Sequence, residues 1–143
     1  MKEMPIKGFY KRLFGVAFLT FLLNKFYLRP WVVEKELADF WQIIVFSLPN
    51  FIEAAMGTLI LTGVFLQLRV YRNMVLRDIH IYWMAVGATA VYVISQELKF
   101  HNLGGNNVYD PYDLLASIIG LVATFIVLQI VDFTDLQNNE HHK

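Results

Sequence analysis

The chain has 143 residues, of which 57% are hydrophobic and 17% are charged, and its 12 basic and 12 acidic side chains give a net charge of zero. This length predicts a single domain, and the apolar excess excludes a disordered or collagen-like chain. Zero net charge gives no electrostatic case for binding to nucleic acid, which requires a dense basic face. The absence of cysteine excludes a disulfide framework and a thiolate metal site, and the composition as a whole indicates a membrane protein.

The first apolar run predicts a short membrane-spanning helix over residues 13–28, with Lys25 as its only charged side chain. Lys7, Lys11 and Arg12 precede this run, as basic residues precede the apolar part of a cleaved signal peptide. The run ends in bulky and polar residues rather than in the small residues that suit cleavage, so we interpret it as a span.

The next apolar stretch, from Phe40 to Leu68, contains Glu53 as its only charged residue and is too long for one straight span of about 20 residues. Pro49 lacks a backbone N–H and disfavours helical backbone in the residue before it, so a helix is expected to begin or kink there. We therefore predict the second span over residues 49–69. The mixed charged and aromatic composition of residues 31–48 predicts a segment lying in the membrane interface, and an extension of the second span is the alternative.

Two further runs, Ile79–Gln96 and Leu114–Val131, each contain 18 residues without Asp, Glu, Lys or Arg. They predict spans over residues 79–98 and 112–131, followed by a polar tail over residues 132–143. The sequence thus predicts an all-α fold, in which residues 1–143 form a single transmembrane domain, a polytopic four-helix transmembrane bundle.

Basic residues near the ends of the spans favour a cytoplasmic N-terminus and C-terminus. With that orientation, the inner side holds Lys2, Lys7, Lys11, Arg12, Arg69, Arg72, Arg77 and Lys143. The outer side holds only Lys25, Arg29, Lys35 and Lys99.

In this topology, polar side chains from all four spans collect near the outer surface. These candidate ligand-binding residues are Lys25, Asn50, Glu53, Glu97, Asp110 and Asp113. Glu53 follows Pro49 by four residues, so it lies about 6 Å deeper along the helix axis. Because an isolated charge at that depth is costly, we expect Lys25 and Glu53 to face inward and to pair.

Helical spacing predicts which face of each span points into the bundle. The expected inward faces are Asn50, Glu53 and Gly57 on the second span, Trp83, Gly87, Ala90, Ile94 and Glu97 on the third, and Asp113, Ser117, Gly120 and Thr124 on the fourth. Small and polar residues of this kind favour close helix packing in lipid.

Other interpretations of these residues remain open. Asp110, Pro111 and Asp113 fit the N-cap, first and third positions of a helix. Glu97 could be a solvated helix end, and Lys25 could extend to the membrane surface. The aspartate pair with Glu97 could instead bind a divalent cation through oxygen ligands. No cofactor is expected.

The stretch QELKFHNLGGNNVYDPYDLLASIIGL, residues 96–121, resembles the VanZ-like membrane proteins. The matching positions are a polar residue before a glycine-containing loop, an aspartate pair and a glycine in the following span, here Gln96 or Glu97, Asp110, Asp113 and Gly120. Ala116 stands where many members have Asn. The upstream residues 48–51 also look like the entry to that family's second span, and Glu53 follows them as its acidic group.

This resemblance implies a protein of the bacterial cell envelope with about four spans in the inner membrane, in a family associated with low-level glycopeptide resistance. It does not supply a reaction. Our leading hypothesis is that the outer acidic cluster binds an envelope lipid or a glycopeptide-related ligand.

Two other classes of function remain open: an accessory subunit of a larger membrane complex, and a small proton- or cation-coupled carrier in a homo-oligomer. Membrane lipids are expected partners in each case. We find no zinc motif, no serine elbow and no phosphate loop, so an enzyme is the least supported class.

Overall fold

The computed structural model describes residues 6–98 and 110–134, and almost all of these residues are helical. The first rod consists of α1 (Gly8–Leu23), a π-helical turn η1 (Asn24–Leu28) and α2 (Arg29–Glu34). It is followed by α3 (Asp39–Arg72), α4 (Asp78–Glu97) and α5 (Pro111–Ile130). The prediction of an all-α fold is confirmed.

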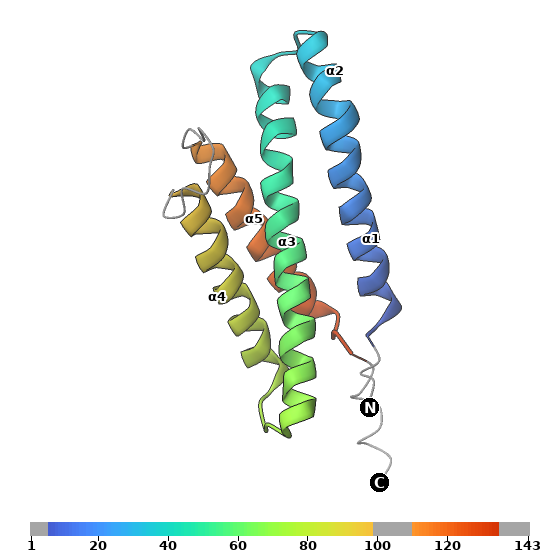
Figure 1. Cartoon of the computed structure of the whole chain (residues 1–143), viewed down its shortest axis with the longest axis vertical. Helices are drawn as coiled ribbons and strands as arrows, with labels where there is room; N and C mark the ends of the chain where they lie inside the picture. Colours follow the sequence, from blue (N-terminus) through green and yellow to red (C-terminus); the bar gives the residue numbers. More distant parts are fainter. Residues whose placement is uncertain (1–5, 99–109, 135–143) are drawn as a thin grey trace.

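The long helix α3 lies at the centre of the arrangement (Figure 1). The rod of α1 and α2 runs beside it in the opposite direction, α4 also runs opposite to α3, and α5 runs parallel to it. The start of α3 and the neighbouring α2 extend beyond the ends of α4 and α5. The two described ends of the chain meet, since the Lys7 N–H donates to the Phe133 carbonyl at 3.2 Å.

Three of these rods are long and apolar enough to cross a membrane: Gly8–Glu34, Asp39–Arg72 and Pro111–Ile130. These findings support the prediction of transmembrane helices. α4 does not meet the same criteria of length and composition, so a fourth crossing at residues 79–98 stays a prediction. The boundaries of α5 agree with the predicted span within one residue.

Of the two expectations for Pro49, a helix start is wrong, because α3 begins at Asp39 and continues through Pro49 to Arg72. A proline inside a helix leaves the carbonyl four residues earlier without its usual donor, and here that carbonyl belongs to Val45. The Asn24 side-chain amide donates to it at 3.0 Å. Arg29 donates to the next carbonyl, that of Phe46, also at 3.0 Å. Residues 31–48 are therefore divided between α2 and the beginning of α3.

A close helix contact joins α5 to α3 at Gly120. A Cβ atom at this position would lie 2.5 Å from the Phe51 carbonyl oxygen and 3.2 Å from the Ala54 side chain. Ser117 and Thr124 are buried on the same face of α5, as its spacing predicts. Glycine at the crossing lets the two backbones approach closely, which is a main source of helix association in lipid.

The predicted inward face of α4 is right in part: Ala90 and Ile94 pack against the core, whereas Trp83 and Gly87 are exposed. Its buried face contains instead Ile81, Tyr82, Ala85, Thr89 and Val93. Thr89 packs against Gly57 of α3, and its hydroxyl donates to the Ala85 carbonyl at 2.9 Å within its own helix. Because the helix satisfies this hydroxyl, the threonine can face its neighbour at no cost in hydrogen bonds.

The turn between α3 and α4 is held by Arg69. Its guanidinium donates to the Leu76 carbonyl at 2.8 Å and forms an ion pair with Asp78. Asn73 ends α3 in left-handed backbone, with φ 49°, a conformation that Asn tolerates better than most residues. Further basic residues, Lys11, Arg12, Arg72 and Arg77, lie on the elements that begin or end here. We call this end of the bundle the basic end.

Candidate functional site

Carboxylates from three helices meet at the opposite end of the bundle, which we call the acidic end. Glu53 lies on α3, Glu97 ends α4, and Asp110 and Asp113 begin α5. Glu97 is close enough to Asp113, Glu53 and Asp110 to interact with each of them electrostatically. The antiparallel course of α4 and the parallel course of α5 produce this convergence, because they bring the end of one helix and the start of the other beside the same part of α3.

Glu53 is joined to α4 by a short chain of hydrogen bonds. The Tyr92 hydroxyl donates to the Glu53 carboxylate at 3.2 Å. The Gln96 amide, one turn further along α4, donates to the Tyr92 hydroxyl oxygen at 2.8 Å. Glu53 and Tyr92 are both exposed, so the pair lies at the surface of the bundle and the expected inward orientation of Glu53 is wrong.

The aspartates have separate roles at the start of α5. Asp110 is the N-cap, and its carboxylate accepts from the Tyr112 N–H at 2.9 Å. This confirms the N-cap interpretation. Asp113 lies in the first turn, and one of its carboxylate oxygens is buried with no hydrogen-bond donor among the described residues. An orphaned oxygen of this kind is costly and can accept a hydrogen bond from an incoming donor.

Lys25 does not join this cluster, and the expected pair with Glu53 is wrong. Lys25 is exposed, and its ammonium lies 5.9 Å from the centre of the Phe26 ring. The neighbouring Asn24 contacts Val45, which precedes Glu53 by eight residues and therefore lies about 12 Å away along α3. The register between α1 and α3 thus separates the two charges. Asn50 is partly buried on α3, one turn before Glu53.

A groove of about 450 Å³ opens beside Glu53, between α1, α3 and α4. It is lined by Phe18, Phe21, Ile52, Glu53, Met56, Gly57, Ile60 and Tyr92. We call it the outer groove. Its walls are apolar apart from the carboxylate and the phenol, so it can accept an apolar chain while the polar pair contacts a headgroup.

Within residues 6–98 and 110–134, no group of three or more His, Asp or Glu side chains is arranged to hold a metal ion. The divalent-cation interpretation of Asp110, Asp113 and Glu97 therefore gains no support. The loop between α4 and α5 and the polar tail lie outside the described residues.

Reasoning from the sequence missed the role of Tyr92, because aromatic residues are common on lipid-facing surfaces and give no local signal. It also missed Asn24, although a polar residue inside an apolar run is itself a signal. Comparisons with protein-family models, curated proteins and solved structures found no match. The side-chain geometry is therefore the basis of the proposal that follows.

Proposed function

We propose that this chain is a VanZ-like integral membrane protein of the bacterial cell envelope that binds an amphiphilic ligand at its acidic end. The headgroup of the ligand, cationic or rich in hydrogen-bond donors, contacts Glu53, Glu97 and Asp113. Its apolar part occupies the outer groove. The observation that supports this proposal is the position of the Glu53 and Tyr92 pair at the edge of an apolar groove, beside two further carboxylates.

The charge balance of the acidic end favours a cationic or donor-rich ligand. Among the residues that the structure describes, the only ion pair joins Arg69 to Asp78 at the other end of the bundle. Carboxylates gathered near hydrocarbon repel one another and lose hydration, and a cation between them offsets both costs. Lys25 does not supply that cation, because it lies in η1, about 12 Å from Glu53 along the axis of α3.

Replacing Glu53 by Gln tests the site. We expect Glu53→Gln to weaken binding of dodecylamine, a single-chain primary ammonium amphiphile, about tenfold, since a hydrogen bond to a charged group contributes about 1.5 to 3 kcal/mol. Binding is measured by calorimetry on the full chain in a neutral detergent. Glu34→Gln, which removes a carboxylate from exposed α2, is the matched control and should bind like the wild type.

Dodecanol, which has the same chain without the charge, should bind more weakly than dodecylamine to the wild type. Equal affinity of the wild type and Glu53→Gln for dodecylamine, or equal affinity of the wild type for the two amphiphiles, would contradict a headgroup site at Glu53. A proton- or cation-coupled carrier would instead lose its transport activity in Glu53→Gln.

One observation is compatible with the accessory-subunit alternative. The tip formed by α2 and the start of α3 extends beyond α4 and α5 (Figure 1) and exposes Trp31, Phe40 and Trp41. Exposed aromatic side chains suit either a membrane interface or a protein partner. A purely structural subunit would show no dodecylamine binding that depends on Glu53.

We propose that the acidic end faces outward and that both termini are cytoplasmic. Because the chain has no cysteine, single cysteines at Asn73 and Asn106 can be labelled without background. A membrane-impermeant maleimide applied to intact cells should modify Asn106→Cys and spare Asn73→Cys. The reverse pattern would invert the orientation, and labelling of both positions would contradict a crossing by α4.

A further inference from the structure

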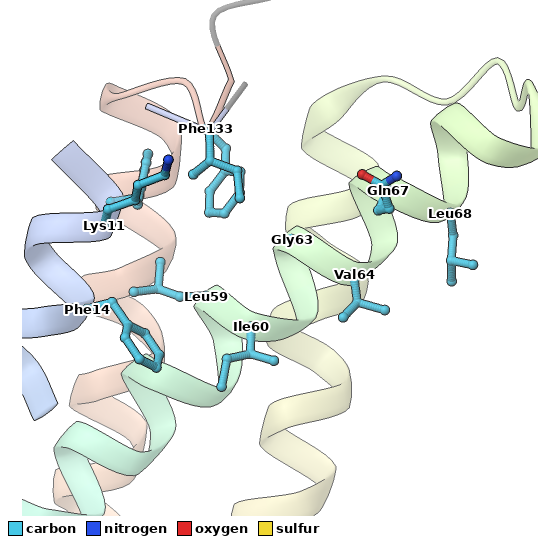
Figure 2. A pocket seen from close by; sticks show the side chains of 11 residues that line it. Lys11, Phe14, Leu59, Ile60, Gly63, Val64, Gln67, Leu68 and Phe133 are labelled. Atoms are coloured by element: carbon cyan, nitrogen blue, oxygen red, sulfur yellow. The ribbon is translucent and has the colours of Figure 1, made fainter. Parts of the chain in front are cut away.

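A second groove, of about 630 Å³, lies at the basic end between α1, α3 and the segment that follows α5 (Figure 2). It is lined by Ile6, Tyr10, Phe14, Leu59, Ile60, Gly63, Val64, Leu68 and Phe133, with Lys11 and Gln67 as its polar members. We call it the inner groove. Ile60 also lines the outer groove, so the two grooves meet along the same side of α3.

The walls of the inner groove are fixed by contacts between distant parts of the chain. The Tyr10 hydroxyl donates to the Val131 carbonyl, and the Tyr10 and Phe133 rings pack with their centres 4.7 Å apart. The Phe133 N–H in turn donates to the Tyr82 hydroxyl oxygen at 3.3 Å. Gly63 lies beside the Phe133 ring, and a Cβ atom there would make an ordinary contact with the ring at 3.7 Å. Contacts with other parts of the chain thus fix Tyr10 and Phe133 in the walls of the groove.

The rim of the inner groove contains one cationic side chain, that of Lys11. Lys11 extends from α1 toward Phe133 in Figure 2, and Arg12 follows it in the chain. Neither has a carboxylate partner in the described part of the chain, where Arg69 and Asp78 form the only ion pair. Gln67 adds an amide donor from α3. An apolar groove with a lysine at its mouth that has no carboxylate partner among the described residues complements a molecule with an apolar chain and an anionic head.

The geometry points to the inner groove as a binding site for one acyl chain of an anionic phospholipid, whose phosphate contacts Lys11. The site is separate from the acidic end and does not depend on the proposed function. Its volume lies within the range of about 300 to 1,000 Å³ that is usual for sites of small organic ligands. An acyl chain that lies against Phe14, Leu59 and Ile60 loses no hydrogen bonds, while the headgroup stays at the membrane surface.

Native mass spectrometry of the full chain tests this site. The protein, in neutral detergent, is equilibrated with equal amounts of phosphatidylglycerol and phosphatidylcholine. We expect the wild type to retain phosphatidylglycerol in preference to phosphatidylcholine. Gly63→Leu fills the groove, so that the groove no longer buries an acyl chain. The amount of retained phosphatidylglycerol should fall about tenfold. Gly87→Leu adds the same side chain where nothing lies within 4 Å, and should retain lipid like the wild type.

The headgroup contact is tested separately with Lys11→Gln. Loss of one lysine near an anionic surface should lower the ratio of phosphatidylglycerol to phosphatidylcholine about fivefold. Lys35→Gln, which removes an exposed lysine between α2 and α3, should leave the ratio unchanged. Equal retention of phosphatidylglycerol by Gly63→Leu and Gly87→Leu would overturn the groove as the site. An unchanged ratio in Lys11→Gln would overturn the headgroup contact.

A second measurement, fluorescence quenching, uses a variant that leaves the groove unfilled. Phe14→Trp places a fluorophore in the groove wall with a conservative change of one aromatic ring for another. Phosphatidylglycerol brominated in its acyl chains should quench the added fluorescence at a lower mole fraction than brominated phosphatidylcholine. Equal quenching by the two lipids would show a non-specific lipid shell and contradict the proposal.

Discussion

Replacing Asn24 by Leu is expected to destabilise the bundle by about 1 to 3 kcal/mol, because it leaves a buried carbonyl without a donor. Asn24 is fully buried, and its amide donates to the Val45 carbonyl at 3.0 Å. Leucine has a similar size, so the lost hydrogen bond rather than a cavity should dominate the change. The measurement is the free energy of unfolding in mixed micelles, followed by the helical circular dichroism signal as a denaturing detergent is added.

A double-mutant cycle with Pro49 identifies the cause. In Pro49→Ala, residue 49 regains its N–H and can donate to the Val45 carbonyl within the helix. Asn24→Leu should therefore cost less in the Pro49→Ala background than in the wild type, by about 1 kcal/mol, the usual contribution of one hydrogen bond. Thr20→Val is the control on α1, since the Thr20 hydroxyl donates only to its own helix at Val16. An equal cost of Asn24→Leu in both backgrounds would contradict the role of Asn24.

The hydrogen bond from Asn24 to the Val45 carbonyl explains why the sequence predicts some helix boundaries correctly and others incorrectly. The start of α5 depends on Asp110 and Pro111, which lie beside each other in the chain, so a local rule places it correctly. The course of α3 through Pro49 depends on Asn24 and Arg29, more than fifteen residues away, as the hydrogen bonds to Val45 and Phe46 show. A local rule cannot include a donor that only the tertiary fold supplies.

The candidate site also has one feature that the sequence predicts, the convergence of carboxylates, and one that it does not, the partner of Glu53. Glu53, Glu97 and Asp113 converge because the direction of each helix decides which ends meet, and helix directions follow from the order of the apolar runs. The partner of Glu53 follows instead from the register between neighbouring helices. That register places Lys25 about 12 Å away along the helix axis and brings Tyr92 into contact, and apolar periodicity contains no information about it.

Gly120→Ala is expected to destabilise the contact between α3 and α5 by about 1 to 3 kcal/mol, the usual cost of overpacking a close contact. The added Cβ would lie 2.5 Å from the Phe51 carbonyl oxygen, so the two helices must separate. Gly87→Ala is the matched control on α4, where nothing lies within 4 Å of the new atom. It should stabilise by up to about 1 kcal/mol, because alanine has the higher helix propensity. The same unfolding measurement in mixed micelles compares the two variants.

A second substitution separates a backbone clash from a side-chain clash. Ala54→Gly removes the side chain that lies 3.2 Å from the added Cβ but leaves the Phe51 carbonyl in place. We therefore expect Ala54→Gly to restore none of the stability that Gly120→Ala loses. Equal stability of Gly120→Ala and Gly87→Ala would mean that α5 does not pack on α3 at Phe51. Because Asp113 lies seven residues before Gly120 on α5, such a result would also remove Asp113 from its place beside Glu97 at the acidic end.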